Sequence, residues 1–239
     1  MIRAVLFDLD ATLIDDGLNW RRSVTQTLEQ VCARHRHVDL QDLLAAYYTV
    51  AGEVWDTVKD APAAPWGNMD AVEIVQRVLG EALHRLHISE KSTLQEAADA
   101  YLRLRSLGAK PYDDVMSCLN RLSPGYELGI VTNGLAAMQQ PKIEAAGLAG
   151  YFRVTTTTDI GFGKPGPEIF MHALDALGVP ADAAVYVGDS LTWDVRGAGN
   201  AGVVSVWLNR NGSERTSDDP LPDAQIVSLA ELPELVPRL

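Results

Sequence analysis

The sequence predicts an α/β protein whose doubly wound parallel sheet is interrupted by an all-helical insert. Short apolar runs alternate with helical patterns through the second half of the chain, and this alternation is typical of βαβ units. A similar apolar run near the amino terminus is separated from the others by a long stretch with helical periodicity and no convincing strand. The simplest arrangement is a discontinuous sheet domain that carries a helical cap.

The expected strands are short and apolar. The first, residues 3–7, stops directly before Asp8, as expected of a strand buried on both faces of a parallel sheet. The helix expected at 167–177 opens on a proline, where a helix tolerates one. The other expected strands are 128–131, 152–158, 184–187, 203–208 and 225–227, and the other expected helices are 135–146, 193–201 and a terminal helix.

The insert shows amphipathic helical patterns and a proline-rich break at residues 60–68. We therefore expect residues 1–16 and 109–239 to form the α/β core domain and residues 17–108 to form the cap. The helical patterns of the cap are 20–34, 40–58, 69–86 and 94–107.

Bulk properties exclude several classes of protein. The net charge is −12 over 239 residues, whereas a nucleic-acid-binding surface needs basic patches, so no nucleic-acid partner is expected. No apolar run has the length of a membrane span. Because the chain passes directly from Met1 into a strand pattern, we expect no signal peptide and a cytoplasmic protein. A monomer or a homodimer would be ordinary for such a chain.

Two carboxylates follow the first strand, at Asp8 and Asp10. Residues i and i+2 of an extended chain share a side, so both can face one cavity while Leu9 packs away from it. Carboxylates so close repel each other, and one would be protonated unless a cation shares the site. A divalent metal ion removes that conflict and leaves one oxygen free as a nucleophile.

Three more polar groups fall near the carboxyl ends of expected strands, where open α/β sheets bind their ligands. Thr132 and Asn133 offer a hydroxyl and backbone amides for phosphoryl oxygens. Lys164, in a glycine-rich loop, could balance the charge of a nucleophile. Asp189 follows the strand 184–187, and Asp194 lies in the first turn of the next helix. Each group is weak evidence alone, but all of them in this order are strong evidence for one site.

With these motifs, the chain resembles the haloacid dehalogenase-like (HAD) hydrolase superfamily, in the branch of phosphatases with a helical cap after the first strand. The resemblance covers nearly the full length. It is most specific in Asp8-x-Asp10-x-Thr12-Leu13, in Thr132-Asn133-Gly134, in Lys164-Pro165 and in Gly188-Asp189-Ser190-x-x-x-Asp194.

The resemblance implies a role for each of these residues. Asp8 would be the nucleophile that forms an aspartyl phosphate, and Asp10 would be the general acid and then the general base. Thr132 and Asn133 would hold phosphoryl oxygens, and Lys164 would bridge the phosphate and Asp8.

The resemblance also implies a magnesium ion. Mg2+ would be held by Asp8, by the backbone carbonyl of Asp10 and by Asp189, with Asp194 in support. One departure is visible at Ala11, where glycine or asparagine is expected in this motif. Because alanine disfavours positive φ, we expect the loop to be slightly shifted, with no effect on the reacting groups.

The expected activity is Mg2+-dependent hydrolysis of a small phosphate ester: a nucleoside monophosphate, a sugar phosphate or phosphoglycolate. A 2-haloacid dehalogenase needs neither Asp10 nor a metal, so these residues favour a phosphatase. A sugar-phosphate mutase, which has the same core residues, and a catalytically silent binding protein on the same fold stay open as alternatives. In the cap, Arg21 is expected to meet a distal anionic group of the substrate and Trp66 to close over the site.

Overall fold

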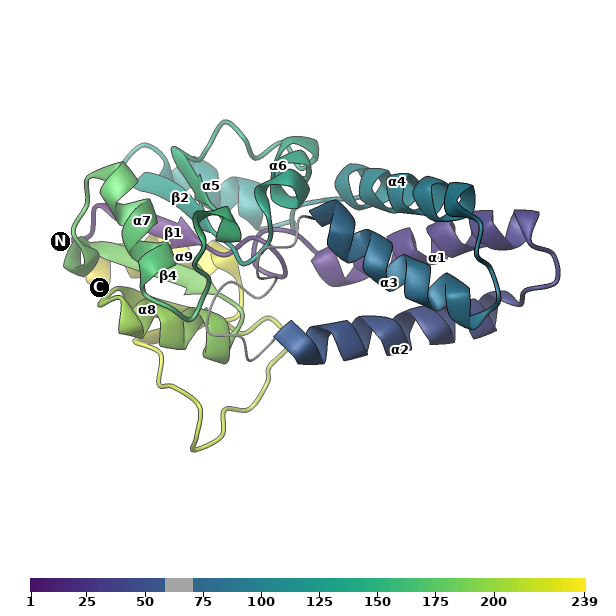
Figure 1. Ribbon diagram of the computed structural model, residues 1–239. Helices are drawn as coiled ribbons and strands as arrows, with labels where there is room; N and C mark the ends of the chain where they lie inside the picture. Colours follow the sequence, from purple (N-terminus) through teal and green to yellow (C-terminus); the bar gives the residue numbers. More distant parts are fainter. Residues whose placement is uncertain (59–70) are drawn as a thin grey trace. The chain divides into compact units, whose positions relative to one another are not determined.

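The computed structural model describes residues 1–58 and 71–239, and the side chains of residues 1–54 and 72–239. Within them lies one parallel sheet, with strand order β3-β2-β1-β4-β5-β6 and helices beside it (Figure 1). The predicted α/β fold with a parallel sheet is therefore confirmed. The strands are β1 (Ala4–Phe7), β2 (Glu127–Val131), β3 (Val154–Thr156), β4 (Ala184–Gly188), β5 (Val204–Leu208) and β6 (Ala224–Ile226).

Strand β1 lies in the middle of the sheet and is buried along its whole length. It pairs with β2 on one side and with β4 on the other, so that Phe7 is in register with Ile130 and with Val187. Because the strands are parallel and end at similar register, their carboxyl ends meet at one edge of the sheet. The side chains that follow these strands are thereby brought together.

Short helices flank the sheet. On one face, Phe170 of α7 packs in the same core as Tyr186 of β4 and Ala198 of α8. Helix α5 is not among the helices predicted from the sequence. Its eight residues make barely two turns, too few for a periodic pattern to be recognised. The helices of this part are α5 (Val115–Leu122), α7 (Glu168–Leu177), α8 (Arg196–Asn200) and α9 (Leu232–Leu235), with single turns at Thr158–Ile160, Ala181–Ala183, Leu191–Val195, Leu229–Glu231 and Val236–Arg238.

The chain divides into two compact units. Unit 1, the sheet unit, comprises residues 1–15, 110–134 and 146–239, and unit 2, the helical unit, comprises residues 16–109 and 135–145. The residues of α6 thus group with the helical unit, although the sequence places them directly after β2, in the predicted core domain. No described helix is both long and apolar enough to cross a membrane.

The helical unit is held together by its own apolar core. Buried leucines at positions 28, 43 and 79 come from three different helices, and Trp20 packs edge-on against Tyr48 beside the buried Tyr47. Amphipathic helices bury one apolar face each in this way. The helices are α1 (Asp16–Arg34), α2 (Leu40–Val58), α3 (Ala71–Arg85), α4 (Lys91–Leu107) and α6 (Ala136–Ala145).

An ion-pair cluster ties three helices of the helical unit. Asp16, the first residue of α1, accepts from Arg105 near the end of α4 (2.6 Å) and from Lys142 of α6 (3.1 Å). Arg105 and Lys142 are both buried, so their charges require such a partner. The cluster joins α6 to α1 and α4, and Met138 of α6 also packs against the apolar core of the helical unit.

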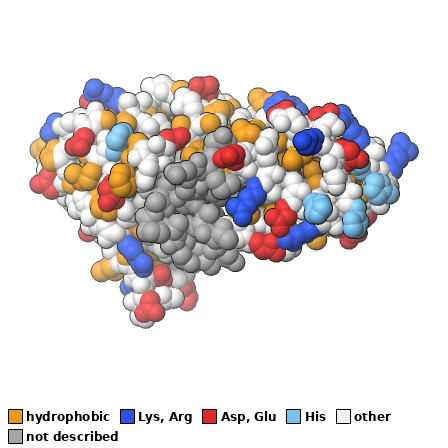
Figure 2. All heavy atoms as spheres, in the orientation of Figure 1, with side chains coloured by type: hydrophobic (Ala, Val, Ile, Leu, Met, Phe, Trp, Pro, Cys, Tyr) orange, Lys and Arg blue, Asp and Glu red, His pale blue; other side chains and the backbone are white. Residues whose placement is uncertain are grey.

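Charged side chains are mixed on the surface. On the face drawn in Figure 2, acidic side chains lie among the basic ones, and no continuous basic patch is seen among the coloured residues. This face agrees with the excess of 32 acidic over 20 basic residues in the sequence.

Candidate active site

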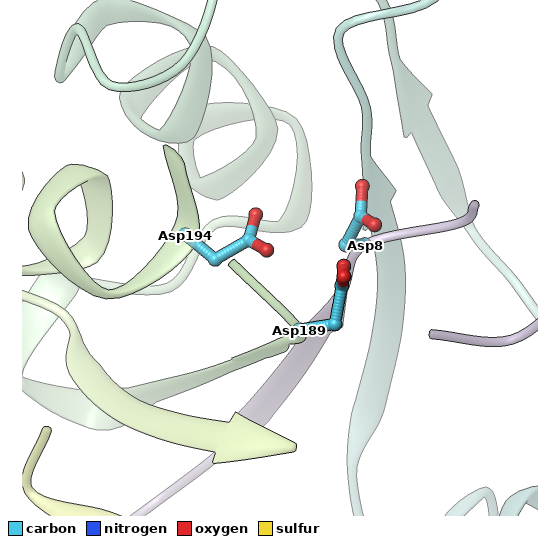
Figure 3. Close-up of side chains that lie close together, drawn as sticks. All are labelled: Asp8, Asp189 and Asp194. Carbon is cyan, nitrogen blue, oxygen red and sulfur yellow. The ribbon is translucent and has the colours of Figure 1, made fainter. Parts of the chain in front are cut away.

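Three carboxylates converge at the carboxyl edge of the sheet. Asp8 directly follows β1, and its backbone N–H donates to Val187 O of β4 (2.9 Å), which extends the pairing of the two strands. Asp189 directly follows β4, and Asp194 lies in the turn after it. One carboxylate oxygen from each of these residues lies within 4.8 Å of the others. Figure 3 shows the three side chains lying close together.

Lys164 makes the electrostatic centre of this group. Its Nζ donates to Asp8 Oδ1 (2.6 Å), to Asp194 Oδ1 (2.7 Å) and to the Tyr186 hydroxyl (2.9 Å). These contacts use all the protons of an ammonium group. Burial alone would lower the pKa of Lys164, but the charges of Asp194 and Asp8 outweigh it and hold that pKa above its ordinary value. Lys164 is therefore a fixed positive charge beside Asp8.

The carboxylates outnumber the positive charge. Burial raises the pKa of Asp8 well above its usual value, Lys164 lowers it, and Asp194 and Asp189 raise it further. Loss of hydration, reinforced by the charge of Asp194, raises the pKa of Asp189 to about 6. Three carboxylates against one ammonium leave a negative excess that a proton or a cation must offset.

The donor set fits a hard divalent cation. All three candidate ligands are carboxylates, and Mg2+ is bound in proteins through one or two carboxylates with water completing its coordination. Of the three residues, Asp8 and Asp194 are buried and Asp189 is exposed, so water can reach this position although the Asp189 carboxylate is partly desolvated beside the other two. These residues thus suit Mg2+ better than a softer metal, which would prefer nitrogen or sulfur ligands.

Asp194 is locked in place from several directions. Its Oδ2 accepts from the backbone N–H of Ser190 (2.9 Å), and its Oδ1 accepts from Lys164. A Cβ built on Gly188 would lie 2.3 Å from the Asp194 carboxyl carbon, so only glycine fits at that position. The close approach of Asp194 thus gives a steric reason for glycine at position 188, which the sequence alone does not supply.

The side chain of Asn133 makes two hydrogen bonds with the backbone of Lys164. Its amide Nδ2 donates to Lys164 O (3.0 Å) and its Oδ1 accepts from the Lys164 backbone N–H (2.7 Å). The side chain therefore holds the backbone of the lysine loop, and the backbone N–H of Asn133 stays the group predicted to meet a phosphoryl oxygen. Thr132 is buried at the end of β2, where its N–H donates to Thr156 O (3.0 Å).

Asp10 lies in the tight turn that follows Asp8. Its carboxylate is not one of the three that cluster, but it is close enough to raise the pKa of Asp189. Ala11, next to it, has φ of +64°, the left-handed conformation that glycine or asparagine adopts more readily. The residue type expected in this motif thus has a conformational reason, and alanine meets the requirement with strain.

Two further site residues, Arg21 and Trp66, were predicted in the cap. Arg21 is exposed on α1 of the helical unit, and Trp66 lies outside the described residues. Their roles stay predictions.

Tyr186 was missed by the sequence analysis. It lies within β4, fully buried, and its hydroxyl donates to Val131 O (2.9 Å) and lies 3.1 Å from Asp194 Oδ1. Tyr186 is the one polar side chain within the apolar strand expected at 184–187, and a buried tyrosine normally finds a hydrogen-bond partner for its hydroxyl. These two facts are the signal by which the sequence could have marked it.

A parallel sheet of this order, with a lysine–aspartate pair and two more carboxylates at its carboxyl edge, defines an α/β enzyme that binds its ligand at the strand ends. The chain belongs to the haloacid dehalogenase-like hydrolases, because the model of that family matches residues 2–202. The resemblance seen in the sequence motifs is thereby confirmed.

Relatives match over the full length of the chain. A glyceraldehyde 3-phosphate phosphatase of Methanopyrus kandleri is 32% identical over 244 residues, covering 100% of this chain and 99% of that protein. An N-acylneuraminate-9-phosphatase of Rattus norvegicus is 30% identical and covers 98% of this chain and 94% of that protein. The solved structure of a 2-haloacid dehalogenase from Pseudomonas syringae pv. Tomato DC3000 is similar with a TM-score of 0.74 at 30% identity, covering 100% of this chain and 99% of that one.

Proposed function

We propose that the protein is a Mg2+-dependent phosphomonoester hydrolase that acts through a phospho-aspartyl intermediate on Asp8. The observation that carries this proposal is the buried pair of Lys164 Nζ and Asp8 Oδ1 (2.6 Å) inside a group of carboxylates that needs a cation. Lys164 engages Oδ1, which leaves the other Asp8 oxygen to attack phosphorus. The phosphatase relatives support the same reaction class.

The chemistry proceeds in two displacements. An Asp8 oxygen forms a bond to phosphorus while the ester P–O bond breaks, and Asp10 gives its proton to the departing alcohol oxygen. A water molecule then attacks phosphorus and loses a proton to Asp10, and the bond between phosphorus and the Asp8 oxygen breaks. Phosphate leaves, and the Asp8 carboxylate is restored.

The remaining groups stabilise charge and position the phosphoryl group. Asp8, Asp189, Asp194 and the backbone carbonyl of Asp10 are the groups proposed to hold Mg2+, which would supply positive charge to neutralise the phosphoryl oxygens. Lys164 supplies a fixed positive charge on the other side. Thr132 and the backbone N–H of Asn133 hold phosphoryl oxygens, which fits a reaction that depends mainly on positioning and electrostatics.

The substrate class is a small phosphorylated metabolite. The named substrates of the relatives are phosphate esters of a three-carbon aldehyde and of an acidic sugar. We propose that the helical unit acts as the cap that selects among such esters, with Arg21 meeting a second anionic group. Substitution Arg21→Gln should then raise KM several-fold for substrates with a carboxylate, and leave KM for neutral sugar phosphates unchanged.

The reaction is tested by measuring phosphate release across a panel of substrates with Mg2+ and with EDTA. The panel holds glyceraldehyde 3-phosphate, an acylneuraminate 9-phosphate, nucleoside monophosphates, phosphoglycolate and an aryl phosphate. Release should require Mg2+ and vanish in Asp8→Asn, whereas Asp175→Asn, an exposed position on α7, should behave as wild type. No release from any substrate by folded wild-type protein would exclude this function.

A 2-haloacid dehalogenase is the second candidate, because a solved structure with that name is 30% identical over the whole chain. Halide release from 2-chloropropionate, measured with EDTA present, distinguishes the two. We expect none, since Asp10 and the carboxylate cluster serve phosphoryl transfer and have no task in displacing a halide.

A further inference from the structure

We propose that the end of strand β5 positions the two loops that carry the site's carboxylates, through Trp207 on one side and Arg210 on the other. This inference rests on the proposed function. It assigns a role to a segment that no step of the reaction uses, since neither side chain is among the groups that touch the substrate or the metal.

Trp207 holds the loop of Asp189. The residue is buried in β5, where it is paired in register with Gly188 of β4. Its indole Nε1–H donates to the backbone carbonyl of Asp189 (2.8 Å). Indole has only this one donor, so the contact fixes both the ring and the peptide group that follows Asp189. The direction in which the Asp189 carboxylate points depends on that peptide group.

Arg210 holds the turn of Asp10. Its Nη2 donates to the backbone carbonyl of Thr12 (3.1 Å), two residues beyond Asp10. The same guanidinium is fixed by a bidentate pair with Asp114 (2.8 and 2.9 Å) and lies 4.1 Å from the centre of the Tyr112 ring. A planar fork held on two sides in this manner fixes the direction of the Nη2–H that donates to Thr12.

Asp114 anchors the arginine to the rest of the sheet unit. It also accepts from the Ser228 hydroxyl (2.7 Å) and the Leu229 N–H (2.9 Å), so its carboxylate has partners beyond Arg210. Asn209 closes the following loop by a pair of hydrogen bonds with the Ser213 backbone (2.9 and 2.8 Å). The Arg210 side chain is thus fixed by Asp114, and the loop that follows Arg210 is closed by Asn209. Its hydrogen bond with the Thr12 carbonyl therefore restrains the turn of Asp10.

The two contacts come from one short segment and reach two different carboxylate loops. Partners that orient metal ligands without touching the metal typically matter about 10- to 100-fold for affinity or activity. Trp207 and Arg210 are therefore positioning residues, and their loss should alter metal binding and turnover beyond any change in stability.

The test compares Trp207→Phe and Arg210→Lys with two control variants. Arg153→Lys is the control for Arg210→Lys, because it makes the same substitution at an exposed ion pair with Glu127. Ser205→Ala is the control for Trp207→Phe, because Ser205 also lies on β5 and the change deletes its hydrogen bond to Asp223. Mg2+ affinity is measured by calorimetric titration of metal-free protein, thermal unfolding by circular dichroism, and kcat and KM on the best substrate of the panel.

We expect Trp207→Phe to weaken Mg2+ affinity about 10-fold and Arg210→Lys to lower kcat about 10-fold with KM within about twofold. The controls should keep wild-type values for Mg2+ affinity and kcat, even where their unfolding temperature falls. Wild-type Mg2+ affinity and kcat in Trp207→Phe and Arg210→Lys, beside an active wild type, would overturn this inference alone and leave a purely structural network. A wild type that neither binds Mg2+ nor releases phosphate would overturn both proposals.

Discussion

Lys164 and Asp8 form a buried ion pair, with Nζ 2.6 Å from Oδ1, between residues 156 positions apart in the sequence. Lys164 also binds Asp194 (2.7 Å), so its single positive charge faces two carboxylates. Removing one partner of a buried pair leaves uncompensated charge, which is more damaging than the loss of an exposed ion pair. The stability and the chemistry of the site are therefore coupled.

Replacing the lysine tests this coupling. We expect Lys164→Met to abolish phosphate release and to lower the free energy of unfolding of the metal-free protein by about 3–5 kcal/mol, because Asp8 and Asp194 lose their positive partner. Mg2+ should restore part of that stability, since it binds the same carboxylates. Urea unfolding with and without Mg2+ measures both effects, and Lys91→Met, at an exposed position of α4, is the control. Unchanged stability in Lys164→Met would contradict the argument.

The pH dependence of Mg2+ affinity follows from the raised pKa of Asp189, about 6 in the metal-free protein. Below that pH a proton competes with the cation at Asp189, so apparent affinity should fall by up to about tenfold per pH unit as the pH drops below 6. Titrations at several pH values between 5 and 8 measure the curve. Asp189→Asn should bind Mg2+ weakly and lose this dependence, and a flat curve for the wild type would refute the prediction.

Stability without metal should show the opposite trend with pH. The folded-state pKa of Asp189 is raised above its unfolded value, so its favourable contribution is complete below the unfolded pKa and is lost as the pH rises through about 6. The metal-free protein should then gain more stability from Mg2+ at pH 8 than at pH 5. Thermal unfolding with EDTA and with Mg2+ at these two pH values checks the sign, and an equal gain at both would contradict it.

A methyl group at Gly188 should disable the site. Its Cβ would lie 2.3 Å from the carboxyl carbon of Asp194, which is too firmly hydrogen-bonded to move freely. We expect Gly188→Ala to cost about 1–3 kcal/mol of stability, as overpacking does, and to lower Mg2+ affinity and kcat together. Gly199→Ala in α8, where nothing lies within 4 Å of the added group, should be neutral or slightly stabilising. Similar behaviour of the two variants would argue against a steric role for Gly188.

Relieving the strain at Ala11 should stabilise the protein. Its φ of +64° is unfavourable for an L-residue by roughly 1–2 kcal/mol. Glycine would remove this strain, but its greater freedom in the unfolded chain would cancel part of the gain. We expect Ala11→Gly to raise the free energy of unfolding by roughly 0.5 kcal/mol. Ala11→Val should lower it, because a β-branched residue fits this conformation worse. Urea unfolding of both variants gives the comparison, and a loss of stability in Ala11→Gly would disprove the strain.

Part of the site was predictable because Asp8 and Asp189 each lie next to a recognisable strand. The strand expected at 3–7 ends before Asp8, and the one expected at 184–187 ends two residues before Asp189. Parallel strands align their carboxyl ends, so local patterns were enough to bring these two aspartates together. Asn133 shows the limit of this reasoning, since its side chain binds the backbone of a residue 31 positions away.

The sequence by itself determined the α/β class and the order of the strands along the chain, and it marked Asp8, Asp189, Asp194 and Lys164 as candidate site residues, because apolar period and strand-end position are local properties. Only the tertiary structure decided that Tyr186 serves Lys164, that Trp207 and Arg210 reach the loops of Asp189 and Asp10, and that α6 groups with the helical unit. These contacts join residues far apart in the chain through single donors and acceptors. A hydrogen bond of that kind leaves no periodic trace in the sequence, and its partner is set by how the strands and helices pack.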